Sequence, residues 1–130
     1  MLNQDLVETV QELRPIVPAK DFEASKRFYA DLGFDIELLG SNLALVQLGR
    51  RSFLLQNYFV EAWAGNFVMH LLVTNLDEWW KHIAGLDLPA RYGVPAPKAP
   101  KLESWGLNVA YVIDPSSVLW HFAERPPRSS

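Results

Sequence analysis

The chain has 130 residues, of which 49% are hydrophobic and 12% aromatic, and it carries a net charge of −3 and no cysteine. This composition supports one packed domain and excludes a disordered chain, a disulfide framework and thiolate chemistry, while the charge does not favour a nucleic-acid partner. No apolar run approaches the ~20 residues that cross a bilayer, and the first residues lack the pattern of a signal peptide, so we expect a cytoplasmic protein with no membrane partner.

The first elements are predicted from helical spacing and from helix-end residues. Apolar residues at helical spacing predict a short helix over 3–13, and the segment 14–20 resembles a strand whose two prolines suit a sheet edge. Asp21 can cap a second helix, and Gly33 can end it. The side chains expected on the buried face of that helix are Phe22, Ser25, Phe28, Tyr29 and Leu32.

A hairpin is expected next, because strand-like segments 42–48 and 52–58 are joined by a turn that begins at Gly49. The plan then repeats. A strand over 67–74 leads into a helix that Asn75 and Glu78 can start as a capping box and that Gly85 ends. Its expected buried face consists of Leu76, Trp79, Trp80 and Ile83.

The chain is expected to end in a second hairpin, formed by strands 107–113 and 118–124 around a turn at 114–117. A long proline-rich loop, 88–105, precedes it, and loops of that length in a compact domain are usually functional or mobile.

The two halves of the chain form an internal repeat. Segment 14–21 aligns with 68–75, and segment 42–49 aligns with 107–114. A strand–helix–hairpin unit therefore occurs twice, and it defines a first module (14–58) and a second module (67–124) within a single domain over 1–130.

Two segments, the helix Asp21–Phe34 and the turn and strand Asp114–Phe122, resemble in their residue patterns and their order along the chain the corresponding segments of one protein family. This is the glyoxalase/bleomycin-resistance/dioxygenase (vicinal-oxygen-chelate) superfamily. The resemblance implies an α+β fold in which two βαβββ modules form curled mixed sheets around a cavity. It also implies a homodimer, often with the binding site shared between the subunits. The turn departs from the family pattern, which usually has glycine where this chain has Ser117.

Catalytic members of this superfamily hold a divalent metal at four strand positions, which the resemblance places here at Arg14, Gln56, Val68 and His121. A guanidinium repels a divalent cation and valine has no donor atom, so this set favours a cavity without metal or other cofactor. His70 lies two residues beyond Val68 and faces the same way in a strand. If a metal binds, the expected ligands are therefore His70, His121 and Gln56.

The candidate ligand-binding residues are Arg14, Gln56, His70, Trp105, Tyr111 and His121. The two histidines, Arg14 and Gln56 would anchor polar groups, while Trp105 and Tyr111 would form aromatic walls. Each has a structural alternative: a hydrogen-bonded core histidine, an arginine paired with a surface carboxylate, or a tryptophan that only packs. No catalytic residue is assigned, because no carboxylate pair or nucleophile motif stands out.

The leading hypothesis is a metal-free, bleomycin-resistance-like protein that binds a small organic ligand in a cavity or dimer groove. The alternative is a metal-dependent lyase, isomerase or ring-cleaving dioxygenase of the glyoxalase type, in which a metal or the histidine pair polarises a carbonyl. A third possibility is a structural or interaction module without a concave pocket.

Overall fold

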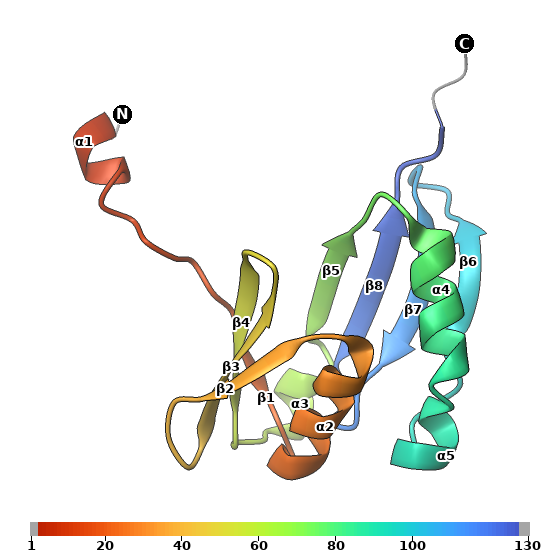
Figure 1. Cartoon of the computed structure of the whole chain (residues 1–130), viewed down its shortest axis with the longest axis horizontal. Coiled ribbons are helices and arrows are strands. Elements are labelled where there is room, and N and C mark those ends of the chain that lie inside the picture. Colours follow the sequence, from red (N-terminus) through yellow and green to blue (C-terminus); the bar gives the residue numbers. More distant parts are fainter. Residues whose placement is uncertain (1–2, 128–130) are drawn as a thin grey trace.

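The computed structural model describes residues 3–127, which form two four-stranded sheets with helices packed on them (Figure 1). The first module contains β1 (Ile16–Pro18), α2 (Phe22–Leu32), β2 (Asp35–Leu38), β3 (Leu43–Leu48) and β4 (Arg51–Gln56). The second contains β5 (Val68–Leu72), α4 (Leu76–Gly85), α5 (Leu88–Tyr92), β6 (Lys98–Leu102), β7 (Asn108–Ile113) and β8 (Leu119–Glu124). Short helices α1 (Gln4–Val7) and α3 (Glu61–Ala64) lie before the first module and between the two.

The two sheets have the same topology, which confirms the predicted α+β class and the two-module architecture. Their strand orders are β1-β4-β3-β2 and β5-β8-β7-β6. In each sheet the first strand pairs in parallel with the last, and the other neighbouring strands are antiparallel. β1 lies at a sheet edge, as its prolines predicted, because an edge strand tolerates the missing N–H groups.

Helix α2 forms as its sequence predicts. The Asp21 carboxylate accepts a hydrogen bond from the Ala24 N–H at 3.1 Å, and Gly33 ends the helix at φ 116°, a left-handed conformation that favours glycine. The five side chains expected on its inner face are the buried ones. Local sequence therefore determines both the ends and the rotation of this helix.

Helix α4 begins at the predicted N-cap but differs from its prediction in two details. The Asn75 side chain accepts from the Glu78 N–H at 3.2 Å, but the Glu78 carboxylate pairs with Lys81 at 3.5 Å, so only half of the expected capping box is formed. Gly85 belongs to the helix, and the C-cap is Leu86 in right-handed conformation, so the predicted stop at Gly85 was wrong by one residue.

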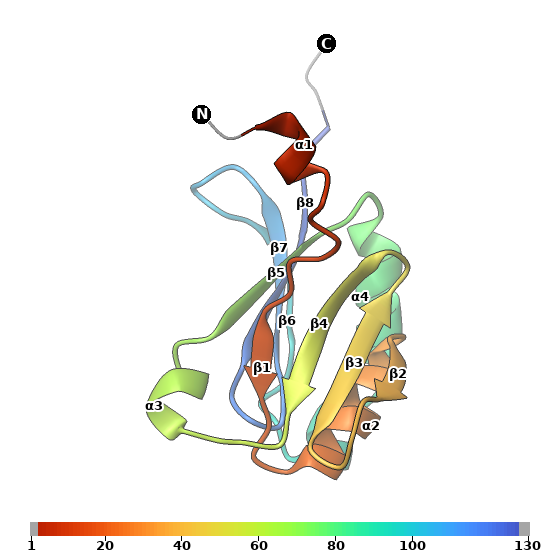
Figure 2. The same ribbon diagram turned by 90° about the vertical axis from the view of Figure 1, so that its left-hand side faces the viewer.

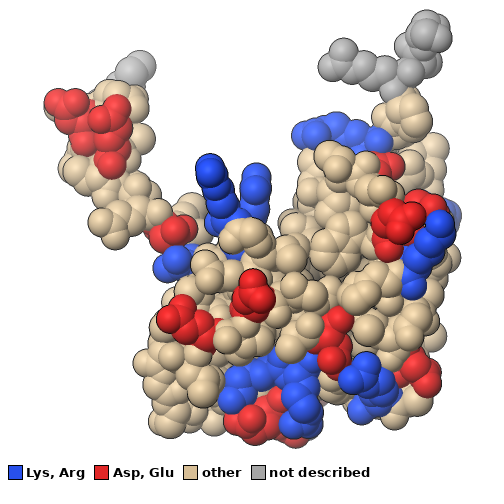
Figure 3. Space-filling model, in the orientation of Figure 1, with Lys and Arg blue, Asp and Glu red and all other residues tan. Residues whose placement is uncertain are grey.

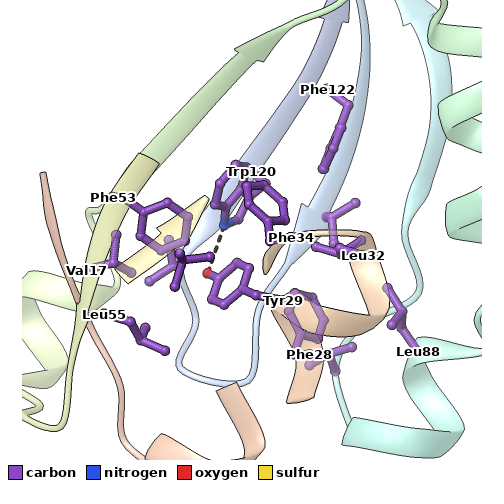
Figure 4. Packing of buried hydrophobic residues seen from close by; sticks show 14 of the residues in the cluster. Val17, Phe28, Tyr29, Leu32, Phe34, Phe53, Leu55, Leu88, Trp120 and Phe122 are labelled. Carbon is purple, nitrogen blue, oxygen red and sulfur yellow. Dashed lines mark hydrogen bonds between the residues drawn. The ribbon is translucent and has the colours of Figure 1, made fainter. Parts of the chain in front are cut away.

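The two modules share one hydrophobic core, and an aromatic cluster marks where they meet (Figure 4). The ring of Tyr29 from α2 lies 5.1 Å from that of Phe53 on β4 and 5.6 Å from that of Trp120 on β8. The Trp120 indole N–H donates to the Tyr29 hydroxyl at 2.9 Å, and that hydroxyl donates to Asp114 at 2.5 Å. Packing and hydrogen bonds across the seam therefore fix the relative position of the modules.

Three other segments correct the sequence-based expectations. The helix predicted over 3–13 is limited to α1, because its apolar side chains have nothing to pack against and an isolated short helix is marginal in water. The strand expected over 14–20 is limited to β1. The expected loop 88–105 contains α5 and β6, which the prolines concealed; β6 is an edge strand with a register shift between Lys98 and Lys101, where Pro100 lies.

The helices cover one face of each sheet. Helix α4 packs over the second sheet and α2 over the first, as Figure 1 shows. Among the described residues no helix covers the opposite face of the second sheet. Seen from the side (Figure 2), α3 and the loop between β6 and β7 project on that uncovered side, one at each end of the sheet.

Candidate functional site

A row of polar and aromatic side chains crosses the uncovered face of the second sheet. His70 on β5 pairs with His121 on β8, His121 with Tyr111 on β7, and Tyr111 with Lys98 on β6. Residues paired across neighbouring strands lie on the same face of a sheet. His121 alternates with the buried Trp120 and Phe122, so this row faces away from the core.

Four of the six predicted ligand-binding residues come together in this row and beside it. The Nδ1 atoms of His70 and His121 lie 3.1 Å apart, within hydrogen-bonding distance. The Trp105 ring lies 6.3 Å from the His70 ring and 5.9 Å from the His121 ring, and the Tyr111 ring lies 5.2 Å from the His121 ring. Trp105 remains 50% exposed, so its ring forms a free aromatic wall beside the imidazoles.

The electrostatics of the row favour a neutral His121. Burial lowers the pKa of His121, and the neighbouring His70 lowers it further, while Glu103 opposes both. Burial also raises the pKa of the Tyr111 hydroxyl, and the Glu103 carboxylate adds to this shift. A hydrogen bond between the two Nδ1 atoms needs one of them to carry the proton and the other to accept. With both rings neutral, the ring that donates through Nδ1 has an acceptor at Nε2, and the ring that accepts at Nδ1 has an N–H donor at Nε2.

A cleft of about 280 Å³ adjoins the row. Its walls are Pro95, Ala96, Lys98, Tyr111, Ile113 and Leu119. The cleft is largely apolar with one cation and one phenol, a composition typical of sites for small organic molecules. No sequence pattern indicated Lys98 as a site residue, because it lies in the segment expected to be a loop.

The other two predicted residues, Arg14 and Gln56, lie on the first module. Arg14 precedes β1, and its guanidinium donates to the Ser52 hydroxyl at 2.7 Å and pairs with Glu12 at 3.4 Å. Gln56 is exposed at the end of β4. Within residues 3–127 neither side chain hydrogen-bonds to the histidine row.

The strand pairings shift the register of the repeat by two residues on β4. Val68 pairs with Leu119, and its repeat mate Arg14 contacts Ser52. Two residues after Arg14 the strand partner is Leu54, and two residues after Val68 the strand partner is His121. His121 therefore corresponds to Leu54, which lies two positions before Gln56. Leu54 has no donor atom, so the repeat offers even fewer ligating groups than the sequence alignment implied.

The residues present do not fit the metal site of the superfamily. Val68 and Leu54 lack donor atoms, and the two imidazoles hydrogen-bond to each other. The described part of the chain contains no group of three or more His, Cys, Asp or Glu side chains arranged to hold a metal ion, whereas a catalytic zinc site uses three protein ligands.

Comparison with known proteins supports the architecture. No family model matches the chain. It is 27% identical over 110 residues to a bleomycin resistance protein from Klebsiella pneumoniae, covering 81% of this chain and 85% of the relative. A bleomycin-binding protein solved in complex with bleomycin superposes with a TM-score of 0.76 at 23% identity, over 90% of this chain and all of the other.

The chain therefore has the fold of the glyoxalase/bleomycin-resistance proteins and is similar in sequence to one of them. A lactoylglutathione lyase from Agrobacterium tumefaciens has the same fold, with a TM-score of 0.65 at 18% identity over 88% of this chain and 92% of the lyase. This glyoxalase-like chain has no described helix long and apolar enough to cross a membrane.

Proposed function

We propose that this glyoxalase-like protein binds a small, partly aromatic organic molecule on the uncovered face of the second sheet. The observation that carries the proposal is the convergence of His70, His121, Tyr111 and Trp105 beside an apolar cleft. Aromatic walls with a few converging polar groups are what such sites provide. Lys98 and the histidines would anchor polar groups of the ligand.

The function that best accounts for this site is sequestration without chemistry. Within residues 3–127 no three His, Cys, Asp or Glu side chains are arranged to hold a metal ion, which supports binding without the metal chemistry of the lyases, isomerases and dioxygenases of the superfamily. The similarity to a bleomycin resistance protein and a bleomycin-binding protein supports a ligand of the same general kind: large enough to span the row and cleft, with planar and polar parts. We place the protein in the cytoplasm, which suits a chain without cysteine.

We also propose that the site is closed by a second copy of the chain. Large apolar side chains lie exposed on the uncovered sides of both sheets, with Ile16 50%, Val68 49% and Leu72 38% exposed. Exposed apolar surface of this kind marks interaction sites. A homodimer would cover it and deepen the shallow cleft, with Arg14 and Gln56 of one copy available to the ligand held by the other.

Calorimetric titration with metal-free bleomycin as the probe tests the function. We expect saturable binding that weakens about tenfold or more in His121→Ala and Trp105→Ala, each of which removes a side chain from the row. Lys81→Ala, on the outer side of α4, is the control and should bind normally. Stoichiometric zinc, nickel, manganese or iron in protein purified without chelator, lost in His70→Ala and His121→Ala, would instead establish the metalloenzyme alternative.

A further inference from the structure

A cleft between helices α2 and α5 lies outside the histidine row and the cleft beside it. Its volume is about 360 Å³, and its walls are Arg27, Ala30 and Asp31 on α2 and Arg91 and Tyr92 on α5. One wall therefore comes from the first module and the other from the second. Both helices lie at the lower end of the molecule in Figure 1, and an ion pair between Asp31 and Arg91 joins them.

The Asp31 carboxylate fixes one of the two arginines of this cleft. It accepts a hydrogen bond from the Tyr92 hydroxyl and pairs with the Arg91 guanidinium, one nitrogen of which lies 2.7 Å from a carboxylate oxygen. The Arg91 Cζ atom also lies 5.6 Å from the centre of the Tyr92 ring, a distance at which a cation is attracted to an aromatic face. A planar guanidinium held in these two ways keeps its remaining N–H groups in a defined direction.

Arg27 supplies a second cation, about one helical turn before Asp31 on α2. Within residues 3–127 no carboxylate forms an ion pair with Arg27. Burial and the Asp31 carboxylate raise the pKa of the Tyr92 hydroxyl to about 12. The positive charges of Arg91 and Arg27 both oppose this rise in the pKa, so both guanidinium groups lie close enough to act on the same hydroxyl.

The charge of the cleft is opposite to that of the whole chain. Two guanidinium groups and one carboxylate give its lining a net charge of +1, whereas the chain carries −3. In Figure 3, basic areas lie over α2 and α5 at the lower end of the molecule. One further negative charge would neutralise the cleft. A carboxylate supplies that single charge on two coplanar oxygens, which match the fork of a guanidinium.

We propose that the cleft between α2 and α5 binds the carboxylate group of a small organic acid, held between the guanidinium groups of Arg27 and Arg91. The apolar part of the acid would lie against the Tyr92 ring and the Ala30 methyl group, which complete the walls. Because the walls come from both modules, a bound acid would join them and stabilise the folded protein according to its occupancy. This site is separate from the histidine row and does not depend on the function proposed for the row.

Titration with sodium benzoate at constant ionic strength, followed by nuclear magnetic resonance of the backbone amide signals, tests the site. Benzamide is the matched probe, because it has the same ring and no charge, and inorganic phosphate tests whether any anion suffices. Arg27→Gln removes a cation at an exposed position, so the fold is preserved. Arg91→Lys keeps the positive charge but loses the planar fork. Lys81→Gln removes an exposed cation on α4 and is the control variant.

We expect the amide signals of Ala30 and Tyr92 to move in a saturable way with benzoate, with a dissociation constant on the order of millimolar, and to stay in place with benzamide. The dissociation constant should rise about fivefold or more in Arg27→Gln and in Arg91→Lys and stay unchanged in Lys81→Gln.

Three results would overturn the proposal. Benzoate that binds Arg27→Gln as tightly as the wild type, or benzamide that binds as tightly as benzoate, would show that the guanidinium groups do not hold a carboxylate. Phosphate that binds more tightly than benzoate would show a site for anions of higher charge. Benzoate that moves the Trp105 indole signal and leaves the amide signals of Ala30 and Tyr92 in place would occupy the histidine row instead of this cleft.

Discussion

The buried carboxyl group of Asp114 should make the stability of this protein depend on pH in an unusual direction. Asp114 is 1% exposed, and its carboxylate accepts hydrogen bonds from the Tyr29 hydroxyl and from the N–H groups of Ser116 and Val118. Burial raises its pKa from 3.8 to about 6, although these three hydrogen bonds act in the opposite direction.

Because the folded protein binds this proton more tightly than the unfolded chain, protonation of Asp114 stabilises the fold. The contribution is fully present below pH 3.8 and is lost as the pH rises through about 6. At about 1.4 kcal/mol per pKa unit, the whole effect is about 3 kcal/mol. Asp114→Asn keeps an acceptor for the two backbone N–H groups and removes the titration.

Urea unfolding of both proteins between pH 3.5 and 7.5, at intervals of about half a unit, measures the effect. The free energy of unfolding of the wild type minus that of Asp114→Asn should increase by about 2.4 kcal/mol as the pH falls from about 7 to about 4. Asp35→Asn, at an exposed position on β2, is the control for general charge effects. A wild-type-minus-variant difference that stays flat across this range, or falls with decreasing pH, would refute the reasoning.

Three further changes test the seam and the helix cap by urea unfolding at pH 7. Tyr29→Phe removes the hydroxyl that joins Trp120 to Asp114 and should cost about 1–3 kcal/mol, since both partners are left buried without it; a neutral result would mean that water replaces the hydroxyl. Phe53→Ala, at 2% exposure in the aromatic cluster, should cost about 3–5 kcal/mol, and a loss below about 1 kcal/mol would show that the seam is loosely packed. Asp21→Ala removes the cap of α2 and should cost about 1 kcal/mol, whereas the same cost in Asp21→Asn would show that charge rather than the capping hydrogen bond is responsible.

The parts of the fold that the sequence predicts are those determined by neighbouring residues. Asp21, Gly33 and the turn at Asp114 act within a few positions of themselves, so the ends of α2 and of the second hairpin could be located. The repeat then predicted that the two modules follow one plan, and the identical strand orders of the two sheets confirm it.

The parts of the fold that the sequence could not predict depend on contacts between residues far apart in the chain. The proline-rich segment becomes β6 because β7 offers it an edge with which to pair. His82 bridges the modules at the carbonyls of Asp31 and Leu32, 3.1 and 3.0 Å away, and nothing near His82 in the sequence marks that role.

The candidate site could be predicted in part from the sequence, and for the same reason. Period-two alternation placed His70 and His121 on one face, and the hydrogen bond between their rings follows from the parallel pairing of β5 with β8. The equivalence of Gln56 with His121 was two residues off, because it relied on hairpins whose turns differ in length. Lys98 could be recognised as a site residue only from the structure, in which the pairing of β6 brings it beside Tyr111.

The central claim is that a small organic ligand binds on the uncovered face of the second sheet. The most direct test follows the tryptophan indole N–H resonances by nuclear magnetic resonance while metal-free bleomycin is added, with Trp105 assigned from a Trp105→Phe variant. The account predicts that the Trp105 resonance moves in a saturable way, while that of Trp79, which packs on Phe122 beneath α4 at 5.5 Å, stays in place. A spectrum that does not change, or a shift of Trp79 without Trp105, would contradict it.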